Sequence, residues 1–318
     1  LGLSEIQGRY ALDQLSGEMH ASIQGSLMEN SGVLRGTMNE RLLEDESGVW
    51  VSAHGARGEF AGTDNAAEVS HSSGGVLGGV DGYLSDSFQL GVMMGYTQSA
   101  LTIAERGSEA RTSSTHIGLY GGTEIGDLAF RSGLAYSWND AETNRSVTFP
   151  GLSETLTASY GLGTVQGFAE ISYGFDLGTT RFAPYVNVAH VAVGGSQFHE
   201  QGGAAALESG GDVNSASFAT LGLRGDTAFS IGEMEVSASG IIGWRQKVGG
   251  SAPAATLRYV AGGGSETING GSLDDSALVV QAGLDLQLAP NATFGASYDG
   301  LVGAGATHTF KANLSVAF

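Results

Sequence analysis

The chain has 318 residues, of which 52 are glycine and none is cysteine, and only 15% are charged. Its formal net charge of −19 argues against nucleic-acid binding, because the phosphates of a nucleic acid would be repelled. No run of about 18 apolar residues occurs, which excludes a helical transmembrane protein. At the start, no signal peptide is recognisable before Leu1, so we expect a mature chain or a part of a longer one.

The first predicted element is a helix over residues 4–46. Apolar residues recur there every four positions, which places them on one face: Leu15, Met19, Ile23, Leu27, Leu34, Met38 and Leu42. Small residues surround this stripe, although each interior glycine costs a helix roughly 1 kcal/mol relative to alanine. We therefore expect one long helix, enclosed on all sides where bulk cannot be tolerated, with a break near Asn30-Ser31-Gly32.

From Gly48 onward the apolar residues follow the two-residue period of strands. In 127–140, for example, Leu134, Tyr136 and Trp138 alternate with Gly133, Ala135 and Ser137. Several such segments are long enough to cross a bilayer as tilted strands, which takes about ten residues. The turn signals delimit twelve predicted strands, at 49–60, 72–85, 87–103, 112–125, 127–140, 158–176, 179–193, 212–230, 233–248, 275–289, 291–302 and 306–318.

The connections between the predicted strands alternate in length. Short ones fall at 85–87, 126–127, 178–179, 231–232 and 289–291, and longer ones at 61–71, 104–111, 141–157, 194–211 and 249–274; the last, at 303–305, is short. Short turns at one rim, long loops at the other and an even strand count are typical of outer-membrane barrels. The sequence therefore predicts an all-β transmembrane fold, a twelve-stranded antiparallel outer-membrane β-barrel over 48–318, preceded by a linker helix over 1–47.

The predicted helix fits inside the predicted barrel. Twelve tilted strands close into a circle of roughly 24 Å, which leaves a bore of about 10–12 Å, the width of one α-helix. We therefore expect the helix to plug the pore. Its predicted pore-facing residues are Leu15, Met19, Ile23, Leu27, Arg35, Met38 and Arg41.

The alternation also assigns charges to the inner wall of the barrel. The predicted lumen charges are Asp81, Arg131, Glu170, Arg224, Arg245, Asp285 and Asp299. Such charges would cost several kcal/mol each in lipid, so an inward placement is favoured. Two interpretations of them remain open: carboxylates of the wall pair with Arg35 and Arg41 of the helix, or the charges solvate a wet lumen.

Several segments together resemble the translocator (β) domain of monomeric, type Va, bacterial autotransporters. They are ALDQLSGEMHAS (11–22), RLLEDESGVWVSAHGARGEF (41–60), FHEQGGAAALESG (198–210), LGLRGD (221–226) and GIIGWRQKVG (240–249), together with the phenylalanine at the end of the last strand. The resemblance covers essentially the whole chain and implies a protein of the Gram-negative outer membrane that anchors and exports its own N-terminal passenger to the cell surface. The first segment is most similar to translocators attached to subtilisin-like serine protease passengers.

The resemblance also implies partners. The last strand carries the predicted assembly signal at Phe310, Leu314, Val316 and Phe318, which the outer-membrane barrel assembly machinery would read. Periplasmic chaperones and a bilayer containing lipopolysaccharide are the other expected partners, and we expect a monomer.

Catalytic and cofactor motifs are not recognisable in the sequence. The seven histidines lack the close spacing of a metal site, so no metal and no cofactor is predicted. Some translocators of this family cut their own helix at a paired asparagine, whereas this helix has isolated Asn30 and Asn39; we expect a helix that is uncut or cut by another protease.

Two other functions remain as alternatives. The first is an outer-membrane protease or lipase, whose groups would come from the outer loops: Asp64, His71, His199, Glu200 and Asp212. The second is a small passive channel, against which the N-terminal helix argues.

Overall fold

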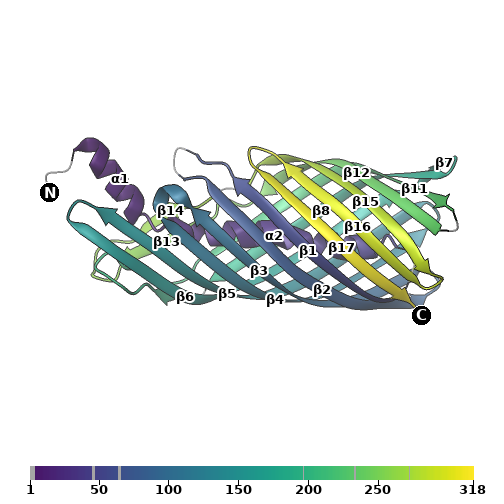
Figure 1. Cartoon of the computed structure of the whole chain (residues 1–318), viewed down its shortest axis with the longest axis horizontal. Coiled ribbons are helices and arrows are strands. Elements are labelled where there is room, and N and C mark those ends of the chain that lie inside the picture. The colour runs from purple at the N-terminus through teal and green to yellow at the C-terminus, as the bar shows by residue number, and fades with distance from the viewer. Residues whose placement is uncertain (1–3, 45–46, 64–65, 196, 233, 272) are drawn as a thin grey trace.

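The structure is a computed structural model that describes residues 4–44, 47–63, 66–195, 197–232, 234–271 and 273–318. Two helices come first, α1 (Glu5–Leu15) and α2 (Glu18–Arg41). Within the described residues, twelve strands then close a barrel (Figure 1): β1 (Gly48–Phe60), β2 (Val69–Ser85), β3 (Phe88–Ile103), β4 (Ser108–Ile125), β5 (Leu128–Phe149), β6 (Leu152–Tyr173), β8 (Thr180–Gly195), β11 (Val213–Ile231), β12 (Met234–Gly249), β15 (Ser276–Ala289), β16 (Ala292–Val302) and β17 (Ala306–Ala317). The short β7 (Phe175–Leu177) continues β6 along β8.

Each barrel strand pairs antiparallel with its neighbours in the chain, and the first strand pairs with the last. The closing pair aligns Gly48 with Ala317 and Glu59 with Ala306, so the seam runs along the whole of β1. Closure matters because a barrel without edges leaves no unpaired row of backbone N–H and C=O groups in lipid. The predicted fold class is confirmed.

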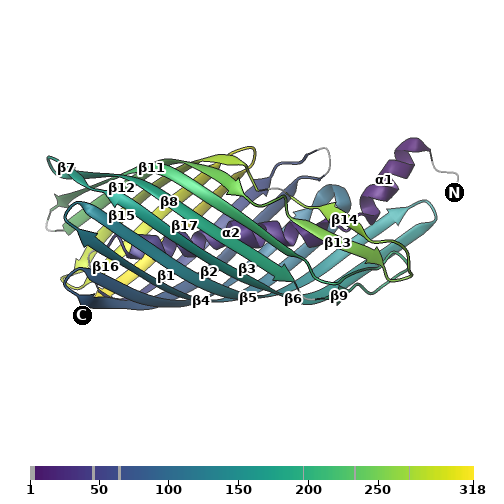
Figure 2. The same cartoon turned by 180° about the vertical axis from the view of Figure 1, so that it is seen from behind.

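The two ends of the barrel differ, and α2 runs between them. Short turns such as Gly126-Asp127 lie at one end, here called the turn end, where the chain also terminates. The opposite end, the loop end, carries the longer connections and α1 (Figure 2). Helix α2 enters at the loop end and finishes near the turn end, inside the barrel.

An apolar band surrounds the barrel on the side of the turn end. Its members are exposed and point outward, among them Val92, Met94, Ile117, Leu134, Trp138, Val165, Ile171, Val188, Leu221, Ile242, Leu284 and Phe310. A continuous apolar surface of this extent is expected of a protein that faces lipid. We call this band the lipid belt. Neither described helix has the length and hydropathy needed to cross a membrane.

Beyond the lipid belt the structure forms an outer collar. It consists of the loop-end parts of β3 to β6, the 3₁₀ turn Ala104–Arg106, and a four-stranded sheet of β9 (Phe198–His199), β10 (Leu207–Ser209), β13 (Ala254–Tyr259) and β14 (Glu266–Asn269). Here the inward side chains are the apolar ones: Leu101, Ile103, Leu156, Tyr160, Leu162, Phe198, Leu207 and Leu257. They pack around the first three turns of α2, at Met19, Ile23 and Leu27.

The prediction of long loops at 104–111 and 141–157 was wrong. Strands β5 and β6 have 22 residues each and join through the tight turn at Pro150-Gly151, and β4 begins at Ser108. The physical reason is that the alternation inverts beyond the lipid belt. Outward positions such as Ser153, Thr155 and Thr157 become polar there, so the pattern of a lipid-facing strand ends although the strand continues. The predicted loops 194–211 and 249–274 contain β9, β10, β13 and β14.

The predicted helix break near Asn30-Ser31-Gly32 was also wrong, because α2 continues through these residues. The break lies at Ser16-Gly17, where Gly17 has a φ of 69°, a conformation that glycine adopts without strain. The prediction that the helical glycines have no room for bulk holds only in part. A Cβ at Gly25 would lie 2.8 Å from the Gly271 carbonyl oxygen, whereas at Gly36 the nearest atom is 3.8 Å away.

The helix-filled pore as the candidate functional site

Helix α2 fills the pore through two apolar contacts separated by polar ones. The upper contact is the outer collar around Met19 and Ile23 described above. In the lower contact, Leu34, Met38 and Leu42 pack against buried wall residues: Trp50, Leu77, Met93, Tyr120 and Phe168. Glycines of the wall make room for these rings; a Cβ at Gly79 or Gly91 would overlap Trp50 or Tyr120. The predicted pore-facing residue Leu15 lies higher, beside a small apolar cluster around Val147 and Leu156.

Near the turn end, Arg41 of α2 is anchored on Asp81 of β2. Its Nε and Nη2 donate hydrogen bonds of 2.7 and 3.0 Å to the two carboxylate oxygens. The Tyr120 hydroxyl donates to Asp81 Oδ2 at 2.7 Å and accepts from Trp50 Nε1 at 2.8 Å. Because both charges are buried, removing either one would deprive the other of its buried ionic partner, which is destabilising. This pair therefore holds the last turn of α2 in a defined position.

Glu170 of β6 is the centre of a second polar cluster. One carboxylate oxygen accepts from Arg224 at 3.2 Å and lies 3.6 Å from Arg131. The other accepts from Asn39 of the helix at 3.0 Å and from Asn187 at 3.2 Å. Glu170 therefore links three barrel strands to α2.

Two acidic residues of the helix face β12 and the closing strands. Glu29 pairs with Arg245 at 3.3 Å. Glu40 pairs with Lys311 of β17, whose ammonium also lies 2.7 Å from Asp299.

Of the two predicted helix–wall pairings, the structure therefore contains the one at Arg41, but a different one at Arg35. The Arg35 hydrogen bonds go to Ser31 Oγ and Gln166 Oε1, at 2.6 and 2.7 Å. The structure places all seven predicted lumen charges on the inner wall; Asp285 lines the cavity at the turn end.

A buried ionic cluster, here called the latch, fastens the helix in the outer collar. Arg145 of β5 donates two hydrogen bonds of 2.8 Å to Glu200 and a third, of 3.0 Å, to the Gln14 carbonyl oxygen at the end of α1. His20 Nε2 lies 2.9 Å from Glu200, and its Nδ1 lies 2.9 Å from the Tyr160 hydroxyl. The His20 ring stacks on Phe198 with a centroid distance of 4.2 Å. The latch thus joins both helices to the barrel.

The latch lies outside the lipid belt, and its burial and hydrogen bonds shift the pKa values of His20 and Glu200. Burial lowers the pKa of His20, against the influence of Glu200. Burial alone would raise the pKa of Glu200, but the hydrogen bonds from Arg145 and His20 outweigh it and lower that pKa to about 2. A neutral His20 therefore donates from Nε2 to the Glu200 carboxylate and accepts from the Tyr160 hydroxyl.

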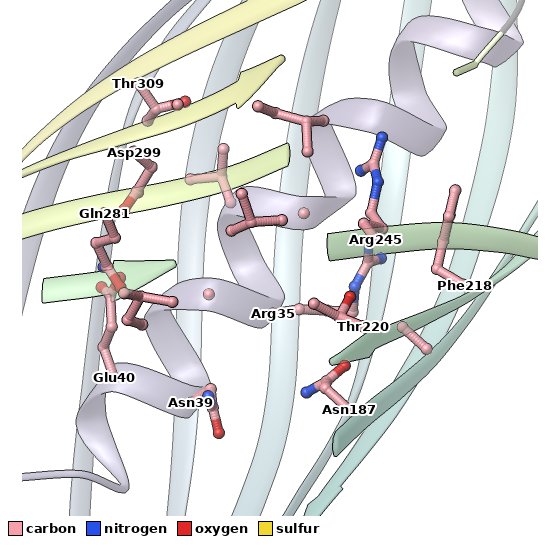
Figure 3. A pocket seen from close by; sticks show the side chains of 18 of the residues that line it. Arg35, Asn39, Glu40, Asn187, Phe218, Thr220, Arg245, Gln281, Asp299 and Thr309 are labelled. Atoms are coloured by element: carbon pink, nitrogen blue, oxygen red, sulfur yellow. The ribbon is translucent and has the colours of Figure 1, made fainter. Parts of the chain in front are cut away.

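Two cavities lie beside α2 in the lumen. The larger, about 600 Å³, opens at the turn end between the last turns of the helix and the wall. The smaller, about 250 Å³, lies higher and is lined by polar and apolar side chains of the helix and mainly of β8 to β17 (Figure 3). Arg35, Asn39 and Glu40 reach toward it from the helix, and Arg245, Gln281 and Asp299 from the wall.

The residues proposed for an outer-rim enzyme have separate surroundings. His71 stacks on Phe60, His199 pairs with Glu208, and Glu200 belongs to the latch. Asp212 accepts from the backbone N–H of Thr256, and Asp64 lies outside the described residues. Over the part of the chain that the structure describes, no group of three or more His, Cys, Asp or Glu is arranged to hold a metal ion.

The predicted assembly residues lie on the outside of the closing strand. Phe310, Leu314 and Phe318 are exposed toward the lipid side, and Val316 is half-buried. The Phe318 backbone N–H donates to the Ser47 carbonyl oxygen at 3.4 Å. Inward neighbours on the same strand, Thr309 and Lys311, are buried.

Sequence reasoning missed part of this site. It did not assign roles to Arg145 or His20, both of which are buried in the structure. A signal was present for Arg145, which continues the inward phase of Arg131 along β5. For the pairing of Lys311 with Glu40 no signal existed, because it depends on how far the helix descends in the pore.

A closed barrel with a lipid belt, a polar lumen and a helix fastened inside it defines an outer-membrane β-barrel whose pore is occupied by its own N-terminal segment. Residues 49–299 match the family described as Autotransporter beta-domain. The chain belongs to this family. It is the translocator domain of an autotransporter, located in the outer membrane of a Gram-negative bacterium, and it exports a passenger domain to the cell surface.

Relatives in sequence and in structure agree with this assignment. Two Serratia marcescens proteins, each named Extracellular serine protease, are 32% identical over 302 residues, which cover 91% of this chain. The chain spans only 29% of the length of these curated relatives.

Three solved structures share the fold. The translocator domain of the autotransporter NalP from Neisseria meningitidis has a TM-score of 0.73 at 15% identity, over 94% of this chain and 96% of that one. The beta domain of the Bordetella autotransporter BrkA has a TM-score of 0.64 at 19% identity, over 86% and 100% of the two chains. The transport unit of AIDA-I from Escherichia coli has a TM-score of 0.57 at 14% identity, over 96% and 99%.

Proposed function

We propose that the exported passenger is the segment encoded before residue 1, and that α2 plugs the pore once export is complete. The observation that carries this proposal is the direction of α2. Its N-terminal end lies at the loop end and its C-terminal end near the turn end, where β1 begins. In outer-membrane barrels the long loops face the exterior and the short turns face the periplasm. Chain that precedes α1 is therefore outside the cell.

A reporter fusion tests this proposal. An epitope fused before Leu1 should be cleaved by a protease added to intact cells, while a periplasmic marker stays protected. An epitope inserted at the turn-end position 126–127 is the matched control and should also stay protected. If the fused epitope is protected although the barrel is inserted, the proposal is wrong.

The same observations support a two-part organisation, with a linker helix over 1–47 and a barrel over 48–318. Helix α2 ends at Arg41 and the first strand begins at Gly48. The polar contacts of Glu29, Arg41 and Asn39 with charged residues of the wall support a plug role for the linker helix.

We further propose a passenger of the subtilisin-like serine protease class, with the barrel itself taking no part in catalysis. The name of the two Serratia marcescens relatives supports this passenger class, and the resemblance at 11–22 agrees with it. Cells that express the complete gene should release a proteolytic activity that a serine-directed inhibitor blocks. Cells that express residues 1–318 alone should not, and activity in those cells would contradict the proposal.

Assembly through the barrel assembly machinery, with help from periplasmic chaperones, remains a proposal supported by the closing strand. The Phe318 side chain is 81% exposed, so its packing contributes little to the folded barrel. Deleting Phe318 should therefore reduce insertion in cells more than it lowers the denaturant midpoint of the refolded protein. Normal insertion of this variant in cells would refute a signal role.

A further inference from the structure

Helix α2 does not occupy the lumen symmetrically. On the side of β2 to β6, the space between helix and wall at the level of Leu34 is only about 20 Å³. On the side of β8 to β17 it is the cavity of about 250 Å³. Three of the helix residues that line this cavity are small, namely Gly32, Val33 and Gly36. The narrow side is therefore closely packed, whereas the wide side contains the cavity shown in Figure 3.

The wall of the wide side combines apolar side chains such as Ile241 and Val279 with buried charges. Arg224 is only 5% exposed, yet its Nε and Nη1 have no hydrogen-bond partner among the described residues. The same holds for Nε of Arg245. Buried polar groups of native proteins are almost always hydrogen-bonded, to ordered water where protein groups are missing. A cavity of this volume beside charged side chains has room for several waters.

This cavity adjoins the larger one at the turn end. Both are lined by Glu40, Arg224, Gln281 and Lys311, which mark the level where they meet. The larger cavity extends down to the turn-end residues Ser87, Asp127 and Arg181. Together the two cavities extend from the turn-end rim to the level of Glu29 and Arg245.

At the loop end, residues 253–271, which contain β13 and β14 and are here called the flap, cover this side of α2 as part of the outer collar. The flap lies against α2 so closely that a Cβ at Gly25 would be 3.2 Å from the Pro253 ring. The Gly271 backbone N–H donates to Ser22 Oγ at 2.9 Å. Asn214 of β11 bonds both Gln24 of the helix and Ala254 of the flap, at 2.8 Å each.

We propose that this translocator domain retains a water-filled side channel along α2, open to the periplasm and sealed from the exterior by the flap. When the flap is displaced, the side channel conducts small hydrated ions while the helix remains in place. The helix closes the pore to polypeptide, and the flap closes it to ions. This inference does not depend on which passenger is exported.

The absence of cysteine from the chain makes a labelling test direct. Thr220→Cys places a thiol on the wide side, and Ser114→Cys places a matched thiol on the packed side. The full chain is reconstituted in liposomes, with a cleavable tag before residue 1 that reports orientation. A small cationic methanethiosulfonate reagent is added outside, and adducts are read by mass.

From the turn end, the Thr220→Cys thiol should react at least roughly tenfold faster than the Ser114→Cys thiol, because reaction requires access. From the loop end both should stay protected. Protection of the Thr220→Cys thiol from the turn end, or its rapid labelling from the loop end, would overturn the proposal. Gly36→Leu, which fills the cavity, should slow the turn-end reaction.

Two further variants test the flap. In one, residues 255–268 are replaced by two glycines; in the other, Gly25→Leu pushes against Pro253 and Gly271. Either change should expose the Thr220→Cys thiol from the loop end and raise single-channel conductance in planar bilayers. The Ser114→Cys thiol should stay protected in both; if it also reacts, the helix has left the pore and the proposal fails.

Discussion

The lipid belt and the outer collar are built from the same strands but have opposite faces, and β6 passes through both. In the lipid belt, its outward side chains are Val165, Ala169 and Ile171, and its inward ones include Gln166 and Glu170. In the outer collar the order is reversed, with serine and threonine outward and Leu156, Ala158, Tyr160 and Leu162 inward. The backbone is one continuous strand, so the solvent alone decides which face is apolar. Each long hairpin is therefore built like a membrane protein in the lipid belt and like a water-soluble protein in the outer collar.

The largest loss of stability is expected from a substitution in the outer collar. Arg145→Ala leaves Glu200 buried without its cation, which costs about 3–5 kcal/mol in other buried pairs. Hydrogen exchange of the 198–207 backbone should report this as local opening of the collar, with the lipid belt unaffected. Arg111→Ala, at an exposed position of β4, should change little. Equal protection in both variants would mean that the latch does not hold the collar closed.

A charge introduced on the outer face of β5 should have different effects in the lipid belt and in the outer collar, because the two regions face different solvents. Leu134→Arg on β5 places the charge in the lipid belt, where it should cost about 2–4 kcal/mol. Ser146→Arg, outward on the same strand but in the collar, should remain within about 0.5 kcal/mol of the parent. Denaturant unfolding from phospholipid bilayers measures both. Similar losses at both positions would contradict the boundary drawn between belt and collar.

Acid should loosen the outer collar before the lipid belt. The pKa of His20 is lowered by burial from its ordinary 6.5, so His20 stabilises the folded collar above pH 6.5 and destabilises it as the pH falls below that value. The pKa of Glu200 is lowered from 4.5 to about 2, so its stabilisation is present above pH 4.5 and is lost between 4.5 and about 2.

Each group contributes at most about 1.4 kcal/mol per pH unit. Hydrogen exchange of 198–207 should therefore accelerate from pH 6.5 downward, and His20→Gln should remove the upper part of this dependence. A collar whose exchange, corrected for the intrinsic rate, is constant from pH 7 to pH 5 would show that His20 is not the sensitive group.

The smallest expected effect compares two glycines of α2. Gly32→Ala would bring the new Cβ only to ordinary contact with Arg35 Nη2, at 3.8 Å, and should stabilise the helix by up to about 1 kcal/mol. Gly25→Ala meets the Gly271 backbone at 2.8 Å and should be destabilising by about 1–3 kcal/mol. Thermal unfolding of the two variants measures both effects, and shifts of the melting temperature in the same direction would contradict the asymmetry of the lumen.

The parts of the structure that the sequence predicted are those that repeat. Alternation assigned the strands of the lipid belt and the inward phase of charges such as Arg131 and Glu170, because a strand fixes side-chain direction every second residue. The same reasoning failed at 141–157, where the inverted pattern resembles a loop.

The individual pairings between the helix and the wall could not be predicted from the sequence. The contact of Glu40 with Lys311 depends on the rotation and depth of α2, which long-range packing decides. The break at Gly17 carried only the weak signal of one more glycine in a helix that contains several.

The lipid belt has a consequence for where the domain can reside. On β5 it extends from Phe130 to Trp138, about 26 Å along the strand at roughly 3.3 Å per residue, or about 20 Å along the membrane normal at a tilt of roughly 40°. The bacterial outer membrane has a thinner hydrocarbon layer than average, whereas a thicker bilayer would bury the serines and threonines of the collar. The height of the belt therefore matches the thin outer membrane and disfavours insertion into a thicker bilayer.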